Sequence, residues 1–156
     1  MEPANGAAER SATMIEIRPI TPEDAAAVGR LLQQLGYAVE PLQVSGRIGQ
    51  LGKTGSDPIL LAVSDRRVLG FIAMHVYQMV QYERPVMRVT ALVVDCRARR
   101  CGIGKLLMDR AESLASTAGC EIVELTSAAT RAEAHAFYRS IGYEPNSLRF
   151  RKVLVA

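Results

Sequence analysis

The chain has 156 residues, 49% of them hydrophobic, and its 19 basic and 16 acidic side chains give a formal net charge of +3. These values fit one ordinary globular domain with a proper core and exclude a strongly basic nucleic-acid arm. No stretch reaches the roughly 20 apolar residues that span a bilayer, so we expect no membrane anchor. The 3 cysteines show no zinc-type pairing with histidine and indicate reduced thiols in a cytoplasmic protein.

Residues 1–13 are small and polar and contain no apolar run of the kind a signal peptide needs. We expect a disordered tail here and one domain over residues 14–156. Met14 stands directly before the first predicted strand and is an alternative start of the protein.

The next segment predicts one strand followed by two helices. Thr21 is a typical N-cap, Pro22 fits the first helical position, and Glu23 adds an early acidic charge. Gly36 suits the end of that helix. The predicted elements are a strand at 15–18, a helix from 22 to about 35, a second helix at 41–51 and a loop at 52–58.

A β-hairpin is predicted next, because two apolar, β-branched runs at 59–63 and 68–77 flank the polar turn 64–67. Residues 79–84 then turn the chain into a buried strand at 87–94. We therefore expect a hairpin that leads directly into the central strand.

The middle of the chain predicts a strand, a phosphate-binding loop and a helix. Arg99-x-x-Gly102-x-Gly104 supplies glycines where the backbone must turn sharply and approach a ligand closely. From Ile103 apolar residues recur at helical spacing to Ala118. The first turn of that helix has free N–H groups and the positive end of the helix dipole, which favour a pyrophosphate.

The last third predicts a strand at 121–126 and a helix that Thr130 and Glu133 begin as a capping box and Gly142 ends. Two short strands are expected at 143–144 and 148–155. The whole order indicates an α/β (α+β) fold with a mixed sheet and helices on both faces.

Two stretches carry a family resemblance. Leu92-Val93-Val94-Asp95 with Arg99-Arg100-Cys101-Gly102-Ile103-Gly104-Lys105 resembles the acetyl-CoA motif of the GCN5-related N-acetyltransferases (GNAT), and 134–144, which contains Phe137-Tyr138 and Gly142-Tyr143, resembles that family's later motif. The resemblance covers about residues 14–155. It implies the GNAT fold, whose mostly antiparallel sheet is splayed at the acetyl-CoA site and carries about four helices.

The resemblance also implies that acetyl-CoA is the co-substrate. The residues expected to bind it are Leu92, Val93, Val94, Arg99, Arg100, Cys101, Gly102, Ile103, Gly104, Lys105, Arg131 and Tyr138. Arg131 replaces an asparagine common in relatives, and the last third of the chain is similar to the small-molecule branch that includes aminoalkylphosphonate and aminoglycoside acetyltransferases.

The resemblance places the Tyr138 hydroxyl near the cofactor sulfur, where a phenol can act as general acid. A backbone N–H of Val94 or Val93 would polarise the thioester carbonyl. Many relatives carry a glutamate where this chain has Ala91, so the usual base is missing. His75, on an alternating strand, is the alternative base. Two weaker candidates are Glu83 and Glu40.

The leading hypothesis is an acetyl-CoA-dependent N-acetyltransferase that acts on a primary amine of a small molecule, as a homodimer, without metal, nucleic-acid or membrane partners. A protein lysine or N-terminal acetyltransferase is the near alternative. A non-catalytic acyl-CoA sensor is another, because the glutamate is absent at Ala91. A nucleic-acid module would rest only on Arg97, Arg99 and Arg100, and its binding should weaken steeply with salt.

Overall fold

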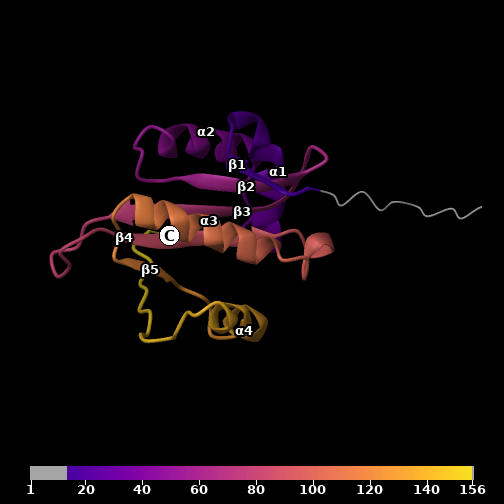
Figure 1. Cartoon of the computed structure of the whole chain (residues 1–156). Coiled ribbons are helices and arrows are strands. Elements are labelled where there is room, and N and C mark those ends of the chain that lie inside the picture. Colours follow the sequence, from indigo (N-terminus) through magenta and orange to yellow (C-terminus); the bar gives the residue numbers. More distant parts are fainter. Residues whose placement is uncertain (1–13, 156) are drawn as a thin grey trace, which may run out of the picture.

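The computed structural model describes residues 14–155. A single five-stranded sheet, in the order β1-β2-β3-β4-β5, carries helices on both faces (Figure 1). The expected tail at 1–13 lies outside the described residues. The strands are β1 (Glu16–Pro19), β2 (Ile59–Ser64), β3 (Arg67–Tyr77), β4 (Val86–Val94) and β5 (Ile122–Leu125). The helices are η1 (Pro22–Asp24), α1 (Ala25–Gln34), α2 (Pro41–Leu51), η2 (Cys96–Ala98), α3 (Ile103–Thr117) and α4 (Ala132–Ser140).

The strand pairing is antiparallel from β1 to β4 and parallel between β4 and β5. The predicted hairpin of β2 and β3 is confirmed, and Asp65 and Arg66 make its turn with φ angles of 47° and 61°. The β3–β4 register shifts between Ala73 and Met74. Because Ala73 pairs with Ala91 and Met74 with Val89, β4 has one extra residue here, and this changes which side chains of β4 lie on each face of the sheet.

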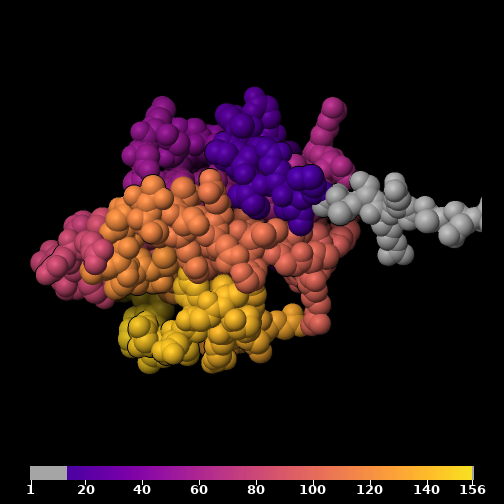
Figure 2. All heavy atoms as spheres, in the orientation of Figure 1, coloured from indigo at the N-terminus to yellow at the C-terminus, as the bar shows by residue number. Residues whose placement is uncertain are grey.

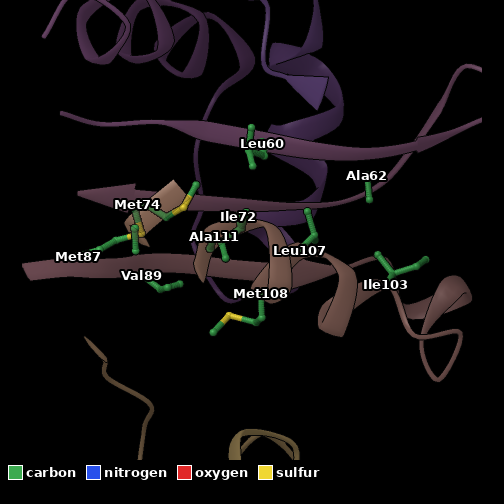
Figure 3. Packing of buried hydrophobic residues seen from close by; sticks show 11 residues of the cluster. Leu60, Ala62, Ile72, Met74, Met87, Val89, Ile103, Leu107, Met108 and Ala111 are labelled. Atoms are coloured by element: carbon green, nitrogen blue, oxygen red, sulfur yellow. The ribbon is translucent and has the colours of Figure 1, made fainter. Parts of the chain in front are cut away.

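Two buried clusters fill the two faces of the sheet. Helix α3 places Leu107, Met108 and Ala111 against Ile72 and the residues around it (Figure 3). Helices α1 and α2 cover the other face with a second apolar cluster. The second cluster contains Val28, Leu31, Val44, Ile48, Leu61, Phe71 and Val93. Alternate residues of β3 and β4 therefore face different helices, as the strand period requires.

The end of the chain corrects two predictions. No strand forms at 143–144 or 148–155, and within the described chain this segment has neither helix nor strand. A strand requires a neighbouring strand for its hydrogen bonds, and here the segment does not pair with the edge strand β5. In the space-filling view, α4 and this segment form a yellow lobe of their own (Figure 2).

The predicted capping box of α4 is also wrong. The N-cap is Arg131 rather than Thr130, and no side chain bonds the first N–H groups. Glu133 consequently lies at the second helical position, one residue too early to reach back to the cap. At the start of η1 the structure instead has Asp24 accepting from the Thr21 N–H at 2.8 Å.

Among residues 14–155, no helix is both long enough and apolar enough to cross a membrane.

Candidate functional site

The pairing of strands β4 and β5 ends halfway along β4. Val86 to Val89 pair with Ile122 to Leu125, and beyond that rung β5 ends while β4 runs on to Val94. The backbone of residues 90–94 therefore has no strand partner on that side. The sheet is thus open at the end of β4 that contains Val93 and Val94, and peptide groups that face this side can bond a ligand.

Buried Asp95 anchors the loop that follows β4. Its N–H donates to the Leu69 carbonyl at 2.8 Å, and its carboxylate accepts from the Arg97 N–H at 2.9 Å. Arg97 and Arg67 also lie 3.3 Å and 3.6 Å from that carboxylate. The hydrogen bond from the Arg97 N–H, followed by the Arg97 side chain and the charges of Arg97 and Arg67, lowers the pKa of Asp95 to about 2. Asp95 belongs to the sequence motif without a predicted role there, although its contacts fix where the loop leaves the strand.

The loop reaches helix α3 through two left-handed residues. Arg100 has φ 60° and Gly102, the N-cap of α3, has φ 76°. No side chain caps α3, so its first N–H groups are free for an anion. A Cβ on Gly104 would lie 3.3 Å from Cζ of Phe137 and 3.8 Å from Cγ2 of Val94. The absence of a side chain at Gly104 therefore allows Phe137 of α4 and Val94 of β4 to lie close to α3.

The cationic side chains of this loop are exposed. The Nε of Arg99 donates to the Val94 carbonyl at 3.4 Å, which holds the guanidinium beside the opening. Arg100 makes no hydrogen bond within the described chain. Lys105 is paired with Asp109 at 2.7 Å, and Cys101 is exposed. Among the residues of this loop that are predicted to bind phosphate, Arg99 and Arg100 contribute the exposed guanidinium groups.

Helix α4 brings Tyr138 to the α3 side of the sheet. Its ring lies 5.3 Å from that of Phe137 and 6.2 Å from that of Tyr143. Burial raises the pKa of the Tyr138 hydroxyl, and nearby Arg131 lowers it to a smaller extent. The phenol is therefore protonated at neutral pH, as a general acid must be. Arg131 itself is exposed at the start of α4.

The segment directly after β5 contains a buried polar atom without a partner. The Ser127 Oγ is buried and has no hydrogen-bond partner within the described chain. A buried hydroxyl without a partner costs free energy, so this hydroxyl is available to bond a group from outside the chain. The sequence did not single out Ser127 because a serine after a strand is commonplace.

His75 lies on the other face of the sheet, and a carboxylate orients it. Its Nδ1 lies 2.7 Å from Oδ1 of Asp57, and its ring stacks on Tyr77 at 5.3 Å. The hydroxyls of Thr54 and Ser56 also donate to Asp57, and with His75 they lower the pKa of that carboxyl. The His75 side chain is 43% exposed.

A row of polar side chains continues across the sheet from His75. His75 is opposite Arg88 on β4, and Arg88 is opposite Glu124 on β5. The Tyr77 hydroxyl donates to Oε1 of Glu124 at 2.6 Å, and Nε of Arg88 lies 3.2 Å from the same oxygen. This row, which we call the polar row, consists of Asp57, His75, Tyr77, Arg88 and Glu124. It lies at the last rungs before β4 and β5 separate.

The remaining candidate bases do not join the polar row. Glu40 precedes α2 and Glu83 lies in the exposed turn before β4. Ala91, where relatives carry glutamate, lines an apolar cavity of about 140 Å³ between α1, α2 and the sheet. Within residues 14–155, no three metal-ligating side chains are grouped to hold an ion.

Comparison with known proteins agrees with this architecture. The sequence model of the Acetyltransferase (GNAT) family matches residues 26–143. An aminoalkylphosphonate N-acetyltransferase of Salmonella typhimurium is 34% identical over 94 residues, which are 60% of this chain and 61% of that protein. The matched part thus spans less than two thirds of that relative.

Two solved structures share the fold. A transcriptional regulator from Bacillus halodurans superposes with a TM-score of 0.83 at 18% identity, covering 90% of this chain and 100% of the other. An aminoglycoside acetyltransferase from an uncultured soil metagenomic sample, in complex with sisomicin, has a TM-score of 0.77 at 20% identity and covers 90% and 97%. At these identities the similarity demonstrates the fold.

Proposed function

The chain belongs to the GNAT acetyltransferase family, and from this premise we propose that it transfers the acetyl group of acetyl-CoA to a primary amine of a small molecule. The observation that carries the proposal is the opening beside residues 90–94 of β4, with the uncapped start of α3 following that strand and Tyr138 packed against the same apolar cluster as Val94. An anionic, amide-containing ligand matches these groups.

The residues present fit acetyl-CoA, which supplies the activated acetyl thioester. The start of α3, with Arg99 and Arg100, would hold the pyrophosphate. The unpaired backbone of β4 and the orphaned Ser127 Oγ would bond the amides of the pantetheine arm. Gly104 leaves the room that a side chain would close, because Phe137 already lies 3.3 Å from its missing Cβ.

The chemistry requires three groups from this chain. The amine nitrogen forms the new C–N bond as the C–S bond breaks, the amine loses a proton, and the thiolate gains one. A backbone N–H of Val93 or Val94 stabilises the carbonyl oxygen. Tyr138 donates the proton to the departing sulfur, because burial keeps its hydroxyl protonated.

His75 accepts the amine proton, directly or through water. An alkylammonium has a pKa near 10.4, so a neutral amine at pH 7 costs about 4 to 5 kcal/mol unless a base removes the proton. Asp57 holds Nδ1 of His75 at 2.7 Å and thereby directs the other nitrogen outward as the proton acceptor. The Asp57–His75 pair would thus replace the glutamate that relatives carry at the position of Ala91.

A small-molecule acceptor is supported by the curated relative, whose name describes acetylation of aminoalkylphosphonates. The three free cysteines fit a reducing cytoplasm. We also propose a homodimer, because β5 is an edge strand and five apolar residues of the last segment are 64% to 90% exposed. These residues are Leu148, Phe150, Val153, Leu154 and Val155.

The test of the function measures CoA release from acetyl-CoA with polyamines, aminoglycosides, aminoalkyl acids and lysine peptides. Mass detection avoids background from the cysteines. Tyr138→Phe should lower kcat about a hundredfold or more with the best amine. Tyr37→Phe, which changes an exposed tyrosine, should leave turnover intact. Acetyl-CoA binding without acetylation of any amine would refute the proposal in favour of the sensor, and turnover confined to peptides would favour the protein acetyltransferase.

A further inference from the structure

The polar row contains a cation that a site for a simple amine does not need. The ion pair between Arg88 and Glu124 is recorded at Nε of Arg88, 3.2 Å from Oε1, and within residues 14–155 neither terminal nitrogen of Arg88 makes a hydrogen bond. The Arg88 side chain is 44% exposed. An outward guanidinium fork is the side chain best suited to bind a carboxylate or a phosphonate through two parallel hydrogen bonds.

Glu124 is fixed in a way that leaves Arg88 available. Its Oε1 accepts from Tyr77 at 2.6 Å and also faces Arg88, whereas its Oε2 has no partner within the described chain. Glu124 therefore aligns the Arg88 side chain without occupying the terminal nitrogens. The Oε2 of Glu124 remains an acceptor within the polar row.

The spacing in the row matches a short molecule with opposite charges at its two ends. His75 and Arg88 are direct cross-strand partners. Side chains at such positions have Cβ atoms about 4.5 to 5.5 Å apart. An amine at His75 and an acid group at Arg88 would thus be separated by only a few bonds. A polyamine, by contrast, would place a second cation against the guanidinium.

We infer that the acceptor is a short aliphatic amine carrying an anionic head group, and that Arg88 is the specificity-determining residue that binds this group. The inference rests on the proposed acetyltransferase function and adds the chemical class of the acceptor. The head group can be a carboxylate or a phosphonate, since both fit the guanidinium fork.

The test compares three acceptors of similar length, 3-aminopropanoate, 2-aminoethylphosphonate and propylamine, with the wild-type protein and Arg88→Gln. The wild type should acetylate at least one acid with a kcat/KM tenfold or more above that for propylamine. Arg88→Gln should raise KM for that acid about 10- to 100-fold and remove most of the preference in kcat/KM for that acid over propylamine. The better of the two acids identifies the head group.

Arg110→Gln is the matched control, because it removes the same charge from the exposed side of α3 and should change neither KM. Arg88→Lys keeps the charge without the fork and should give an intermediate KM. Thermal unfolding of each variant checks the fold. Equal use of propylamine and the acids, or an equal loss for all three acceptors in Arg88→Gln, would overturn the inference while leaving the acetyltransferase function in place. No turnover of any amine would refute the function itself.

Discussion

Nδ1 of His75 lies 2.7 Å from Oδ1 of Asp57, a contact that joins β3 to the loop before β2 across 18 residues of sequence. The Asp57 carboxylate also accepts hydrogen bonds from Thr54 at 2.6 Å and Ser56 at 2.8 Å. Three donors thus hold the carboxylate in place, and the carboxylate in turn fixes the imidazole. Such an arrangement makes Asp57 a positioning residue for the proposed base.

Replacement of Asp57 should reveal this role. Asp57→Asn keeps the shape but replaces the carboxylate that orients Nδ1 of His75, so we expect kcat/KM for the amine to fall about 10- to 100-fold. KM for acetyl-CoA should stay the same, because Asp57 lies on the face opposite α3. Steady-state kinetics with both substrates across pH 6 to 9 measures the effect. Asp65→Asn, in the exposed β2–β3 turn, is the control. A uniform loss through acetyl-CoA affinity would contradict the positioning role.

Removal of the Ser127 hydroxyl should weaken acetyl-CoA binding without weakening the fold. Its Oγ has no partner in the described chain, so Ser127→Ala removes an unpaired buried group and should leave the melting temperature unchanged or higher. The bond that the hydroxyl makes to bound acetyl-CoA is lost, so the Kd should rise about fivefold. Calorimetry gives both values on the same samples. A lowered melting temperature with an unchanged Kd would show a purely structural serine.

A side chain at residue 104 should close the acetyl-CoA opening. The Cβ of Gly104→Ala would press on Phe137 at 3.3 Å, so we expect KM for acetyl-CoA to rise about tenfold or more. Gly46→Ala is the matched control, since nothing lies within 4 Å of its added Cβ in α2. That control should stabilise the protein by about 0.5 to 1 kcal/mol and leave kinetics unchanged. Equal kinetics for the two alanine variants would argue against the placement of the cofactor.

Acid should destabilise the protein partly through Asp24. Arg18 lies 2.8 Å from this carboxylate, and their hydrogen bond is the main reason that the Asp24 pKa falls from 3.8 to about 2. A lowered pKa means that the folded state favours the charged form. The stabilisation is therefore fully present above pH 3.8 and is lost as the pH falls through about 2.

The corresponding variant is Asp24→Asn. It should cost about 2 kcal/mol of unfolding free energy at pH 7 and much less near pH 2. Urea unfolding at both pH values tests this, with Asp65→Asn as the exposed control. A loss of equal size at both pH values would mean that the carboxylate charge is not responsible.

The amino-acid sequence alone determined the part of the site that is local in the chain. The strand ending at Val94, the glycine loop and helix α3 were readable because apolar spacing, glycine positions and free helical N–H groups belong to consecutive residues. The order of the elements also predicted the fold, since each predicted element up to α4 forms within a residue or two of its expected limits.

Only the tertiary structure decided which distant residues meet. Asp57 reaches His75, and Tyr77 reaches Glu124 across 47 residues, because the pairing of β3, β4 and β5 and the register shift after Ala73 set their alignment. A one-residue difference in register would turn these side chains to the opposite face. The strands expected at 143–144 and 148–155 do not form, because strand formation also depends on pairing with a distant segment. A strand-like pattern states a tendency, whereas a strand exists only where a neighbour supplies its hydrogen bonds.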